Sequence, residues 1–303
     1  MNNVAICIPT FKRQEMLKKL VQSIVVSNFD KALIKEVYII VVDNDEKKTA
    51  EPVINELKEK YNDLFLIDYS CHPLKGISNV RNESIKRALS FNPDFLVFVD
   101  DDEYVAAEWL NELVKTILNN DADAVRGPAI AVLDKTISEN ISYWFIRKTY
   151  PNNAQIRLVE TNNLILNCVS LKKFDVWFDP RFNVIGSGDS YFGIQILNKG
   201  ARIFWAADAV VYETIPGSRA NIKWLIKRIY RGASTYTYVL KLEREYFAIL
   251  KKILISCAYI FSGICALIIL PLPIRKKYWG IFTISEGIGG IVGLFNILYK
   301  EYK

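Results

Sequence analysis

Four consecutive acids, Asp100-Asp101-Asp102-Glu103, are the residues of this chain best suited to chemistry. They directly follow an apolar run, residues 95–99, whose length and composition predict a strand buried on both faces. In an open α/β sheet, ligands bind at the carboxyl ends of the strands. Clustered carboxylates raise one another's pKa unless positive charge lies among them, and a hard divalent cation that also binds phosphate oxygens would supply it. The stretch alone leaves a second interpretation open, a solvated acidic turn after a core strand.

Polar residues also follow the other predicted strands of the first half. Pro9-Thr10-Phe11-Lys12-Arg13 closes the first strand, and its loop opens toward the same sheet edge as the four acids. Asp43-Asn44-Asp45 closes the second strand, where a carboxylate is placed to accept hydrogen bonds from a ribose or a base. The segment 76–82, Gly-Ile-Ser-Asn-Val-Arg-Asn, gives a turn and then Arg81 at a helix start, which favours an anion or a structural ion pair.

Strands alternating with helices must hold these residues. We predict strands at 4–9, 36–42, 64–69 and 95–99, separated by helices at 14–26, 49–61 and 78–89. This alternation predicts an α/β fold with a mainly parallel sheet covered by helices. In the second half we predict strands at 123–128, 163–168 and 202–212, a loop at 137–160, and a helix that begins at Asp189.

The end of the chain is apolar enough to meet a membrane. Hydrophobic residues make up 51 % of the 303 residues, and the mean hydropathy of +0.11 is high for a purely soluble protein. The 22 residues from Ile253 to Ile274 carry no formal charge, and a second apolar stretch runs from Tyr278 to Tyr299. These stretches form a transmembrane hairpin, lie in the membrane interface, re-enter the same leaflet, or make a buried helix pair. We expect membrane association with the topology open. A full hairpin would carry residues 275–277, Arg-Lys-Lys, across the membrane, against the positive-inside tendency.

The remaining features narrow the class of protein. Residues 218–232 are basic and amphipathic, which suits a clamp over a diphosphate, a helix resting on anionic lipid, or a nucleic-acid patch. We favour the first two, because nothing resembles a base-reading module and no nucleic-acid partner is expected. The five scattered cysteines predict buried free thiols rather than disulfides or a zinc site. The single histidine, His72, argues against histidine-based hydrolases, and the absence of a secretory signal predicts a cytosolic N-terminal part.

Taken together and in this order, the motifs closely resemble glycosyltransferase family 2, whose members have the GT-A fold. The matching elements are Pro-Thr-Phe-x-Arg at 9–13, Val-Val-Asp-Asn at 41–44, Gly-Ile-Ser-x-x-Arg-Asn at 76–82, and Asp100-Asp101-Asp102 as the D-x-D motif. Further on, Thr161-Asn162-Asn163 looks like the family's T-G-N element, and residues 186–189 look like its G-G-E-D element. The resemblance covers about residues 3–235 and is strongest to enzymes of bacterial exopolysaccharide assembly.

The resemblance implies a role for each matching residue. Asp100 and Asp102 would flank a nucleotide diphosphate, with Asp102 the most direct ligand of Mg²⁺ or Mn²⁺. Asp189 would be the general base in a single displacement with inversion, because no second carboxylate is dedicated to act as a nucleophile. The other expected donor-binding residues are Pro9, Thr10, Arg13, Asp43, Asp45, Arg81, Asp101, Arg219 and Arg228. The expected acceptor-side residues are Asn163 and Gly188.

Two positions depart from the family pattern. Gly188 stands where the family usually has Glu before the base, so the acceptor pocket has lost one carboxylate. Glu213 stands where many relatives have a metal-binding His. A carboxylate there either binds the same hard ion or holds Arg219 or Arg228.

The sequence therefore predicts a metal-dependent, inverting glycosyltransferase with a catalytic domain at 1–235 and a membrane-associated tail at 236–303. Within the catalytic domain, residues 1–103 would bind the nucleotide sugar and residues 104–235 the acceptor. We expect it to transfer a sugar from a UDP-sugar to a saccharide or to a polyprenyl-diphosphate-linked saccharide. The reaction would build a surface polysaccharide at the cytoplasmic face of a bacterial inner membrane. A membrane-bound scaffold with a degenerate transferase domain is one alternative. A nucleotidyltransferase is another, although residues 9–13 are not the glycine-rich loop that it would need. The motifs do not name the donor sugar, the acceptor or the linkage.

Overall fold

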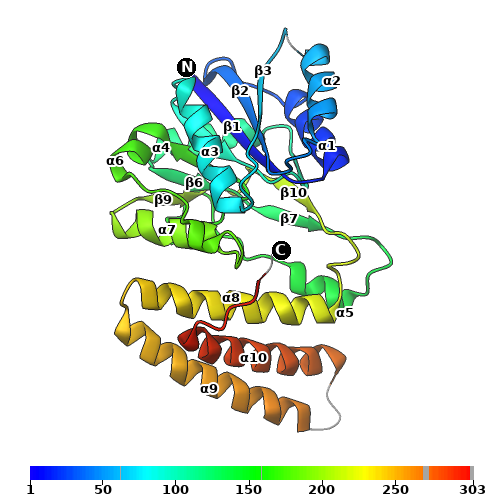
Figure 1. The fold of residues 1–303 in the computed structure, drawn as a ribbon, viewed down its shortest axis with the longest axis vertical. Helices are drawn as coiled ribbons and strands as arrows, with labels where there is room; N and C mark the ends of the chain where they lie inside the picture. Colours follow the sequence, from blue (N-terminus) through cyan, green and yellow to red (C-terminus); the bar gives the residue numbers. More distant parts are fainter. Residues whose placement is uncertain (62, 158, 269–272, 301–303) are drawn as a thin grey trace. The chain divides into compact units, whose positions relative to one another are not determined.

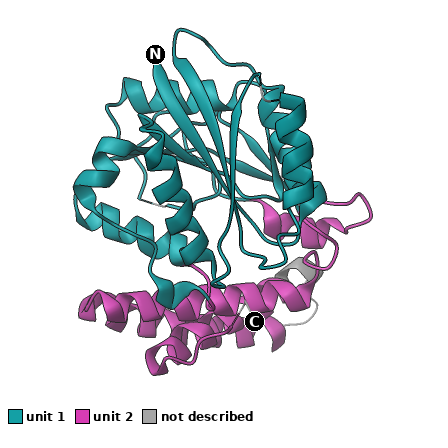
Figure 2. Ribbon diagram, turned by 45° about the horizontal axis from the view of Figure 1, so that its top comes forward, with its two compact units in different colours: residues 1–132, 147–183, 188–214 teal, residues 133–146, 184–187, 215–303 magenta. Residues whose placement is uncertain are grey.

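The computed structural model describes residues 1–303 with the exception of 62, 158, 269–272 and 301–303. The chain divides into two compact units, which Figure 2 distinguishes by colour. Unit 1 comprises residues 1–132, 147–183 and 188–214. Unit 2 comprises residues 133–146, 184–187 and 215–303. The boundary that we predict after residue 235 stays a prediction.

A seven-stranded sheet forms the centre of unit 1 (Figure 1). In spatial order its strands are β3 (Leu66–Cys71), β2 (Ile34–Asp43), β1 (Asn2–Thr10), β4 (Phe95–Phe98), β8 (Leu164–Asn167), β6 (Ala124–Arg126) and β9 (Ile203–Trp205). Neighbouring strands are parallel, except that β8 runs antiparallel to both β4 and β6. The predicted α/β fold with a mainly parallel sheet is therefore confirmed.

Helices cover both faces of this sheet because its central strands are apolar on both sides. Val4, Ile6 and Ile8 of β1 pack in one cluster with α1 (Gln14–Val25), α2 (Glu51–Tyr61) and α4 (Trp109–Asn119). Ala5 and Cys7 point the other way, since successive side chains of a strand alternate, and pack with α3 (Ile77–Ser90), α6 (Cys168–Phe174) and α7 (Gly188–Asn198). The seven strands and helices predicted up to residue 99 are all present, and no end differs from the prediction by more than two residues.

A smaller sheet of unit 1 corrects one prediction from the sequence. It consists of β5 (Glu103–Val105), β10 (Val211–Thr214) and β7 (Ala129–Val132), with β10 in the middle. The single strand predicted at 202–212 is in fact two strands in different sheets, because the chain turns where Ala209 N–H donates to the Ala206 carbonyl (3.3 Å). The turn delivers β10 antiparallel to β5, with Glu213 directly opposite Glu103.

Unit 2 is built mainly from three long helices, α8 (Ile222–Leu242), α9 (Tyr246–Ile268) and α10 (Ile274–Val292). The predicted loop at 137–160 contributes a short helix, α5 (Glu139–Ser142), and a 3₁₀ turn, Tyr143–Phe145. The predicted basic helix begins at Ile222, because the Asn221 side chain accepts a hydrogen bond from Trp224 N–H (3.0 Å). Both α9 and the segment Lys277–Phe295 are long and apolar enough to cross a membrane. Part of the apolar run 253–274 lies outside the described residues.

Candidate active site

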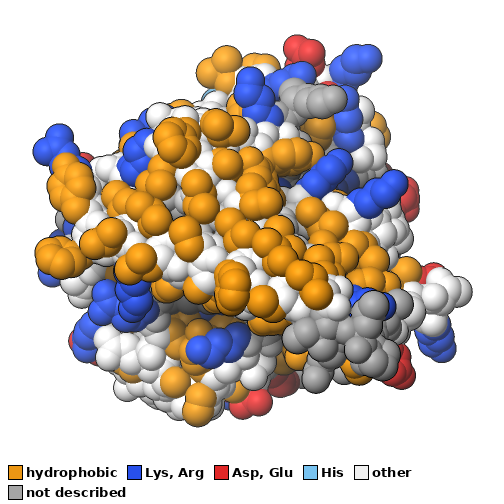
Figure 3. Space-filling view, turned by 90° about the horizontal axis from the view of Figure 1, so that it is seen from below, with side chains coloured by type: hydrophobic (Ala, Val, Ile, Leu, Met, Phe, Trp, Pro, Cys, Tyr) orange, Lys and Arg blue, Asp and Glu red, His pale blue; other side chains and the backbone are white. Residues whose placement is uncertain are grey.

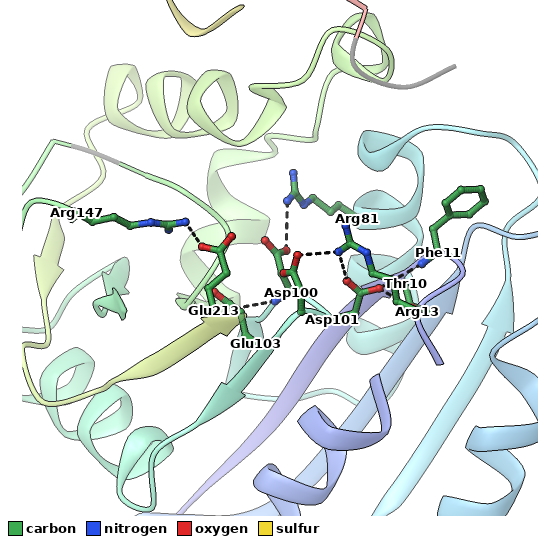
Figure 4. A network of polar contacts seen from close by, with 10 residues as sticks. Thr10, Phe11, Arg13, Arg81, Asp100, Asp101, Glu103, Arg147 and Glu213 are labelled. Carbon is green, nitrogen blue, oxygen red and sulfur yellow. Dashed lines mark hydrogen bonds and ion pairs between the residues drawn. The ribbon is translucent and has the colours of Figure 1, made fainter. Parts of the chain in front are cut away.

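The acids that follow β4 are held inside unit 1. Asp101, Asp102 and Glu103 are buried, whereas the Asp100 side chain is 34 % exposed. Figure 4 shows their carboxylates between Arg13 and Arg81 on one side and Arg147 on the other. The alternative of a solvated acidic turn is therefore wrong.

Residues of the first loop bind two of these acids. Thr10 Oγ1 donates to Asp101 Oδ2 (2.8 Å), and Arg13 Nη1 donates to Asp101 Oδ1 (2.7 Å) and Asp102 Oδ2 (2.9 Å). The Thr10 hydroxyl and the Arg13 guanidinium, which we expect to contact the donor, thus donate hydrogen bonds to carboxylates of the protein itself. Pro9 is buried within β1 opposite Val42, and its predicted contact with the donor stays a prediction.

The acids hold more negative charge than these arginines balance. Burial raises the pKa of Asp100 to about 7, with the neighbouring carboxylates adding to the effect and Arg81 opposing it. Burial also raises the pKa of Asp101, against the opposing effect of Arg13. For Glu103, burial and the nearby Asp100 raise the pKa well above its usual range. Such a site favours a further cation.

Arg81 approaches the acids from α3. Its Nη2 lies 3.6 Å from Asp100 Oδ1, and its guanidinium lies over the ring of Phe178, 5.5 Å from the centroid. The side chain is buried, and its Nε has no hydrogen-bond partner among the described residues. Of the two roles that the sequence left open for Arg81, the structure shows the ion pair.

The turn before α3 is occupied by a protein side chain. Asn183 Oδ1 accepts hydrogen bonds from Ser78 N–H (2.9 Å) and Asn79 N–H (3.2 Å) at the start of the helix. Gly76 has a φ of +129°, and a Cβ there would lie 2.2 Å from the Asn183 side chain, so only glycine fits. The anion that we expect at this helix start is therefore replaced by an amide oxygen.

Asp43 and Asp45 differ in what their carboxylates bind. Asp43 accepts hydrogen bonds from Asp45 N–H (2.9 Å), Ala50 N–H (3.1 Å) and the Tyr69 hydroxyl (3.1 Å), and is fully buried. It shapes the loop after β2 rather than offering a free oxygen to the donor. Asp45 is also buried, but its Oδ2 has no partner among the described residues, so it retains an acceptor for a ligand.

Glu213 is paired with an arginine that the sequence analysis did not single out. Arg147 Nη2 donates to Glu213 Oε2, and Glu103 lies directly across from Glu213 in the small sheet. Like charges placed opposite each other repel unless a cation lies between them. Although burial alone lowers the pKa of Arg147, Glu213, Glu160 and Glu103 raise it above its usual value. The predicted pairing of Glu213 with Arg219 or Arg228 is thus replaced by Arg147.

Arg219 and Arg228 belong to unit 2. Arg228 lies in α8, with its guanidinium over the ring of Trp224, 5.2 Å from the centroid. Arg219 precedes the same helix. Their expected contacts with the donor stay predictions.

Asp189 opens α7, as predicted, and lies near a buried arginine. Its Oδ1 accepts a hydrogen bond from Ser190 N–H (2.8 Å). Arg126, at the end of β6, forms an ion pair with Glu160 and also interacts electrostatically with Asp189. Burial is the main cause that lowers the pKa of Arg126, whose Nε has no partner among the described residues. The charge of Asp189 acts on Arg126, so the acid that we predict as the base lies near a buried cation.

Gly188 is placed where the chain is tightly packed. A Cβ at this residue would lie 3.0 Å from Ser78 Oγ and 3.2 Å from Phe182 Cβ. The usual glutamate would thus require its neighbours to move, which is a physical reason for the departure from the family pattern.

Asn163 joins several elements of unit 1 through its buried side chain. Its Oδ1 accepts from Trp109 Nε1 (2.6 Å), and its Nδ2 donates to the carbonyls of Pro128 (2.9 Å) and Ala209 (2.6 Å). The amide thus links α4 to the residue before β7 and to the turn before β10. The predicted acceptor contact of Asn163 stays a prediction.

Three residues of the site, Arg126, Arg147 and Glu160, were not predicted. Arg126 lies inside the strand predicted at 123–128, and only the observed β6 ends at this residue, so its place at a strand end was not visible in the sequence. Arg147 and Glu160 lie in the irregular segment 137–160, where no periodicity or motif marks them.

The carboxylates of the site suit a divalent cation that is also bound by phosphate oxygens of a substrate. No group of three or more His, Cys, Asp or Glu placed to hold a metal occurs among the described residues. Mg²⁺ commonly binds through one or two carboxylates together with phosphate oxygens and water, so a full protein cage is not needed. The raised pKa of Asp100 and the partnerless buried Oε1 of Glu103 fit a nearby cation.

Comparison with known proteins finds relatives of the whole chain and structures that share its fold. The chain is 27 % identical over 302 residues to the succinoglycan biosynthesis protein ExoM of Rhizobium meliloti, a match that covers 97 % of this chain and 94 % of that protein. Among solved structures, residues 1–349 of S. aureus TarS in complex with UDP-GlcNAc match with a TM-score of 0.56 and 15 % identity, covering 98 % of this chain and 93 % of that one. GalNAc-T7 with UDP, GalNAc and Mn²⁺ matches with a TM-score of 0.57 and 14 % identity, covering 78 % of this chain and 51 % of that one. At such identities these structures share the fold.

The family itself follows from the sequence. The family model of glycosyl transferase family 2 matches residues 5–174, more than half of the chain, and spans β1 to α6 with all four acids. The chain therefore belongs to glycosyl transferase family 2 and is a glycosyltransferase.

Proposed function

We propose that this glycosyltransferase moves a sugar from a UDP-sugar to a saccharide acceptor during the assembly of a bacterial surface polysaccharide, with inversion at the anomeric carbon. The observation that carries the proposal is the buried acid cluster after β4 in the same unit as Asp189, the acid that opens α7. The relation to a succinoglycan biosynthesis protein supports the pathway class. The UDP complexes among the fold neighbours support the choice of nucleotide.

The donor nucleotide is assigned to the loops after β1, β2 and β4. Asp45 Oδ2, which has no partner among the described residues, is suited to accept a hydrogen bond from the base or ribose. Asp43 positions Asp45 by accepting its backbone N–H. Thr10 and Arg13 hold Asp101 and Asp102 in place.

Asp100 and Asp102 would hold a Mg²⁺ or Mn²⁺ ion together with the diphosphate. When bound, the ion neutralises the charge that develops on the leaving diphosphate. Arg81 lies beside Asp100 and adds a positive charge near the same leaving group. Arg147 keeps Glu213 and Glu103 from repelling each other, and Glu213 remains a candidate third ligand.

Asp189 is the proposed general base. It would take the proton from the acceptor hydroxyl as that oxygen attacks the anomeric carbon, on the face opposite the leaving diphosphate. A single displacement of this kind inverts the anomeric configuration. Arg126 is proposed to position Asp189, because the two groups interact by charge.

The acceptor is proposed to be lipid-linked and met at the cytoplasmic face of the membrane. The two apolar helical segments of unit 2 support membrane association. A saccharide on a polyprenyl diphosphate carries its reactive end to the membrane surface, where a membrane-associated transferase reaches it.

A screen of nucleotide sugars tests the proposal. The full chain is incubated with a panel of UDP-sugars and GDP-sugars with Mn²⁺, with Mg²⁺ or with EDTA, and nucleotide release is measured. We expect one UDP-sugar to be consumed in the presence of metal, and Asp102→Asn to reduce the rate at least about 100-fold. Equal rates with metal and EDTA would contradict metal dependence. Binding of UDP without any turnover, even with acceptor, would favour the degenerate scaffold.

A further inference from the structure

Within unit 2, α10 lies along α8, and the two helices run in the same direction. Ser285 Oγ donates to the Ile226 carbonyl (3.0 Å), and further along Lys241 Nζ donates to Asn296 Oδ1 (2.8 Å). Both contacts advance along α8 and α10 in the same direction, so the two helices are parallel. Figure 1 shows the two axes side by side.

Glycines bring these two backbones close together. A Cβ at Gly289 would lie 2.5 Å from the Tyr230 carbonyl oxygen, and one at Gly293 would lie 2.4 Å from the Ser234 carbonyl oxygen. No side chain fits at either position unless α8 and α10 separate. Small residues at a helix contact give close backbone packing, so the pair moves as one body.

The third helix, α9, packs against α10 in the opposite direction. A Cβ at Gly263 would lie 2.6 Å from the Gly280 carbonyl oxygen, and one at Gly287 would lie 2.5 Å from the Ser256 carbonyl oxygen. Lys252 Nζ and Glu286 Oε1, 3.5 Å apart, continue the same antiparallel register. The axes of α8, α9 and α10 thus run alongside one another.

This packing opposes a membrane crossing. The part of α10 that is long enough to cross a bilayer lies against the part of α8 that carries Lys227, Arg228 and Arg231. If α10 crossed, its partner α8 would take these charges into the hydrocarbon core, where charged side chains are costly. Because α9 packs along α10, it would have to leave α10 in order to cross alone.

The outer face of α9 is a continuous apolar stripe. Its exposed apolar residues recur every three or four positions, with Cys257 between Leu254 and Phe261, and from Ile253 to Ile268 the helix holds no charged residue. The stripe consists of Phe247, Leu250, Leu254, Phe261, Ile264 and Ile268. Figure 3 shows a broad band of hydrophobic side chains on this face, with lysines and arginines at its margins. An exposed apolar surface of this kind is typical of a site that binds a protein or a membrane.

The distribution of charge identifies the partner of this surface as anionic lipid. Residues 215–303 contain fourteen Lys and Arg and four Glu, a net charge of +10, whereas residues 1–214 carry a net charge of −4. An apolar helix face bordered by basic residues is the composition of a helix that lies in the headgroup region. A protein partner would not require cations spread along all three helices.

We propose that unit 2 docks on one leaflet of an anionic membrane without crossing it: α9 is immersed along its apolar stripe, α10 lies behind it, and α8 faces the water. The proposal deepens the membrane association of the proposed function and rests on it. It commits to a monotopic arrangement in place of the transmembrane hairpin that the sequence left open.

Vesicle flotation tests the docking face. The full chain is floated with vesicles of phosphatidylcholine alone and with vesicles that contain about one third phosphatidylglycerol. We expect binding to the anionic vesicles, and the double variant Phe247→Ser/Phe261→Ser to lower it more than about tenfold. The matched control, Val26→Ser/Leu66→Ser, removes exposed apolar side chains from unit 1 and should bind as the wild type does. Equal binding of both double variants would overturn the assignment of the stripe.

Labelling of a single cysteine distinguishes docking from crossing. Pro273→Cys, at the exposed start of α10, is made in a background with Cys71, Cys257 and Cys265 changed to Ser; Cys7 and Cys168 are buried. A membrane-impermeant maleimide is added to inverted inner-membrane vesicles and to spheroplasts of the expressing bacterium. We expect labelling in the inverted vesicles alone, because a docked hairpin keeps residue 273 on the cytosolic side. Labelling in spheroplasts would show a crossing and overturn the proposal.

Enzyme assays separate the two proposals. UDP-sugar consumption is measured for the Phe247→Ser/Phe261→Ser variant in detergent solution, away from any bilayer. Normal consumption combined with lost vesicle binding supports the docking face. Absent consumption by the wild type in every condition would remove the proposed function, while the flotation result still decides the docking.

Discussion

At the scale of single residues, the acids of the site depend on arginines from three separate segments. Arg13 follows β1, Arg81 lies in α3, and Arg147 lies in the irregular segment before β8. Each binds a different carboxylate, so no single loop movement releases all of the charge. The negative charge of the acids that these arginines leave unbalanced would attract the metal ion that binds together with the diphosphate.

Replacement of the proposed base should separate chemistry from binding. We expect Asp189→Asn to lower sugar transfer at least about 100-fold, because amide nitrogen and oxygen do not accept the acceptor's proton. Metal-dependent binding of UDP, measured by calorimetry, should stay within a factor of about two. Asp208→Asn, an exposed acid in the turn before β10, is the matched control and should transfer at the wild-type rate. Transfer by Asp189→Asn at a near wild-type rate would remove Asp189 as the base.

Removal of Arg147 should destabilise the fold as well as the site. Arg147→Ala leaves Glu213 and Glu103 facing each other without their cation, and we expect a loss of about 3 kcal/mol in the free energy of unfolding. Urea denaturation measures this loss. The double variant Arg147→Ala/Glu213→Gln should recover part of it, because one of the two charges is gone. Arg157→Ala, at an exposed position nearby in sequence, should have little effect.

At the scale of elements, one buried amide joins three parts of unit 1. Asn163→Ala leaves Trp109 Nε1 and the carbonyls of Pro128 and Ala209 without their hydrogen bonds. We expect a loss of about 3 kcal/mol in unfolding free energy, measured by urea denaturation, since each stranded buried group is costly. Asn119→Ala, at an exposed asparagine of α4, is the control and should change stability by less than about 0.5 kcal/mol. An equally stable Asn163→Ala protein would contradict the joining role.

The first half of the fold could be predicted from local pattern because each strand there is a continuous apolar run. β1 and β4 are buried on both faces, and the acids or turn residues that follow them mark their ends. The strand predicted at 202–212 was wrong, since a turn between two apolar segments leaves little trace in hydropathy. That error concealed the second sheet, and with it the pairing of Glu213 with Glu103.

Part of the site depends on contacts that no local pattern contains. Arg147 and Glu213 are 66 positions apart, and Asn183 reaches Ser78 across 105 positions. Motifs mark the residues that meet the substrate, and the resemblance to the family placed Asp100, Asp102 and Asp189 in order. The partners that hold those residues are chosen by tertiary packing, which is why the hydrogen bonds of Asn163, Thr10 and Arg13 within the protein could not be predicted.

At the scale of the whole molecule, charge is divided between the two ends of the chain. The net charge of +10 in residues 215–303 and of −4 in residues 1–214 gives an acidic catalytic region and a basic tail. A basic tail is drawn to anionic lipid, and salt screens this attraction. The same arrangement keeps the acidic region from binding the lipid surface by charge.

Salt should therefore weaken membrane binding without affecting the donor site in the same way. We expect flotation with phosphatidylglycerol vesicles to fall at least about tenfold between about 0.05 M and 0.5 M NaCl. The Arg244→Gln/Lys251→Gln variant, which removes one exposed cation just before α9 and one within it, should show a shallower dependence on salt. Binding that does not change with salt would mean that the apolar stripe acts alone.

The reversed direction of β8 has a consequence for how this chain tolerates change. Because β8 runs against β4 and β6, its first residues meet the ends of those strands, and the chemistry gathers at one edge of the sheet. The connections at the opposite edge, which include Asn92 and Gly200, are exposed, and a Cβ at Gly200 would have open space around it. Inserted peptides, affinity handles or natural length variation are accommodated there at little cost to catalysis.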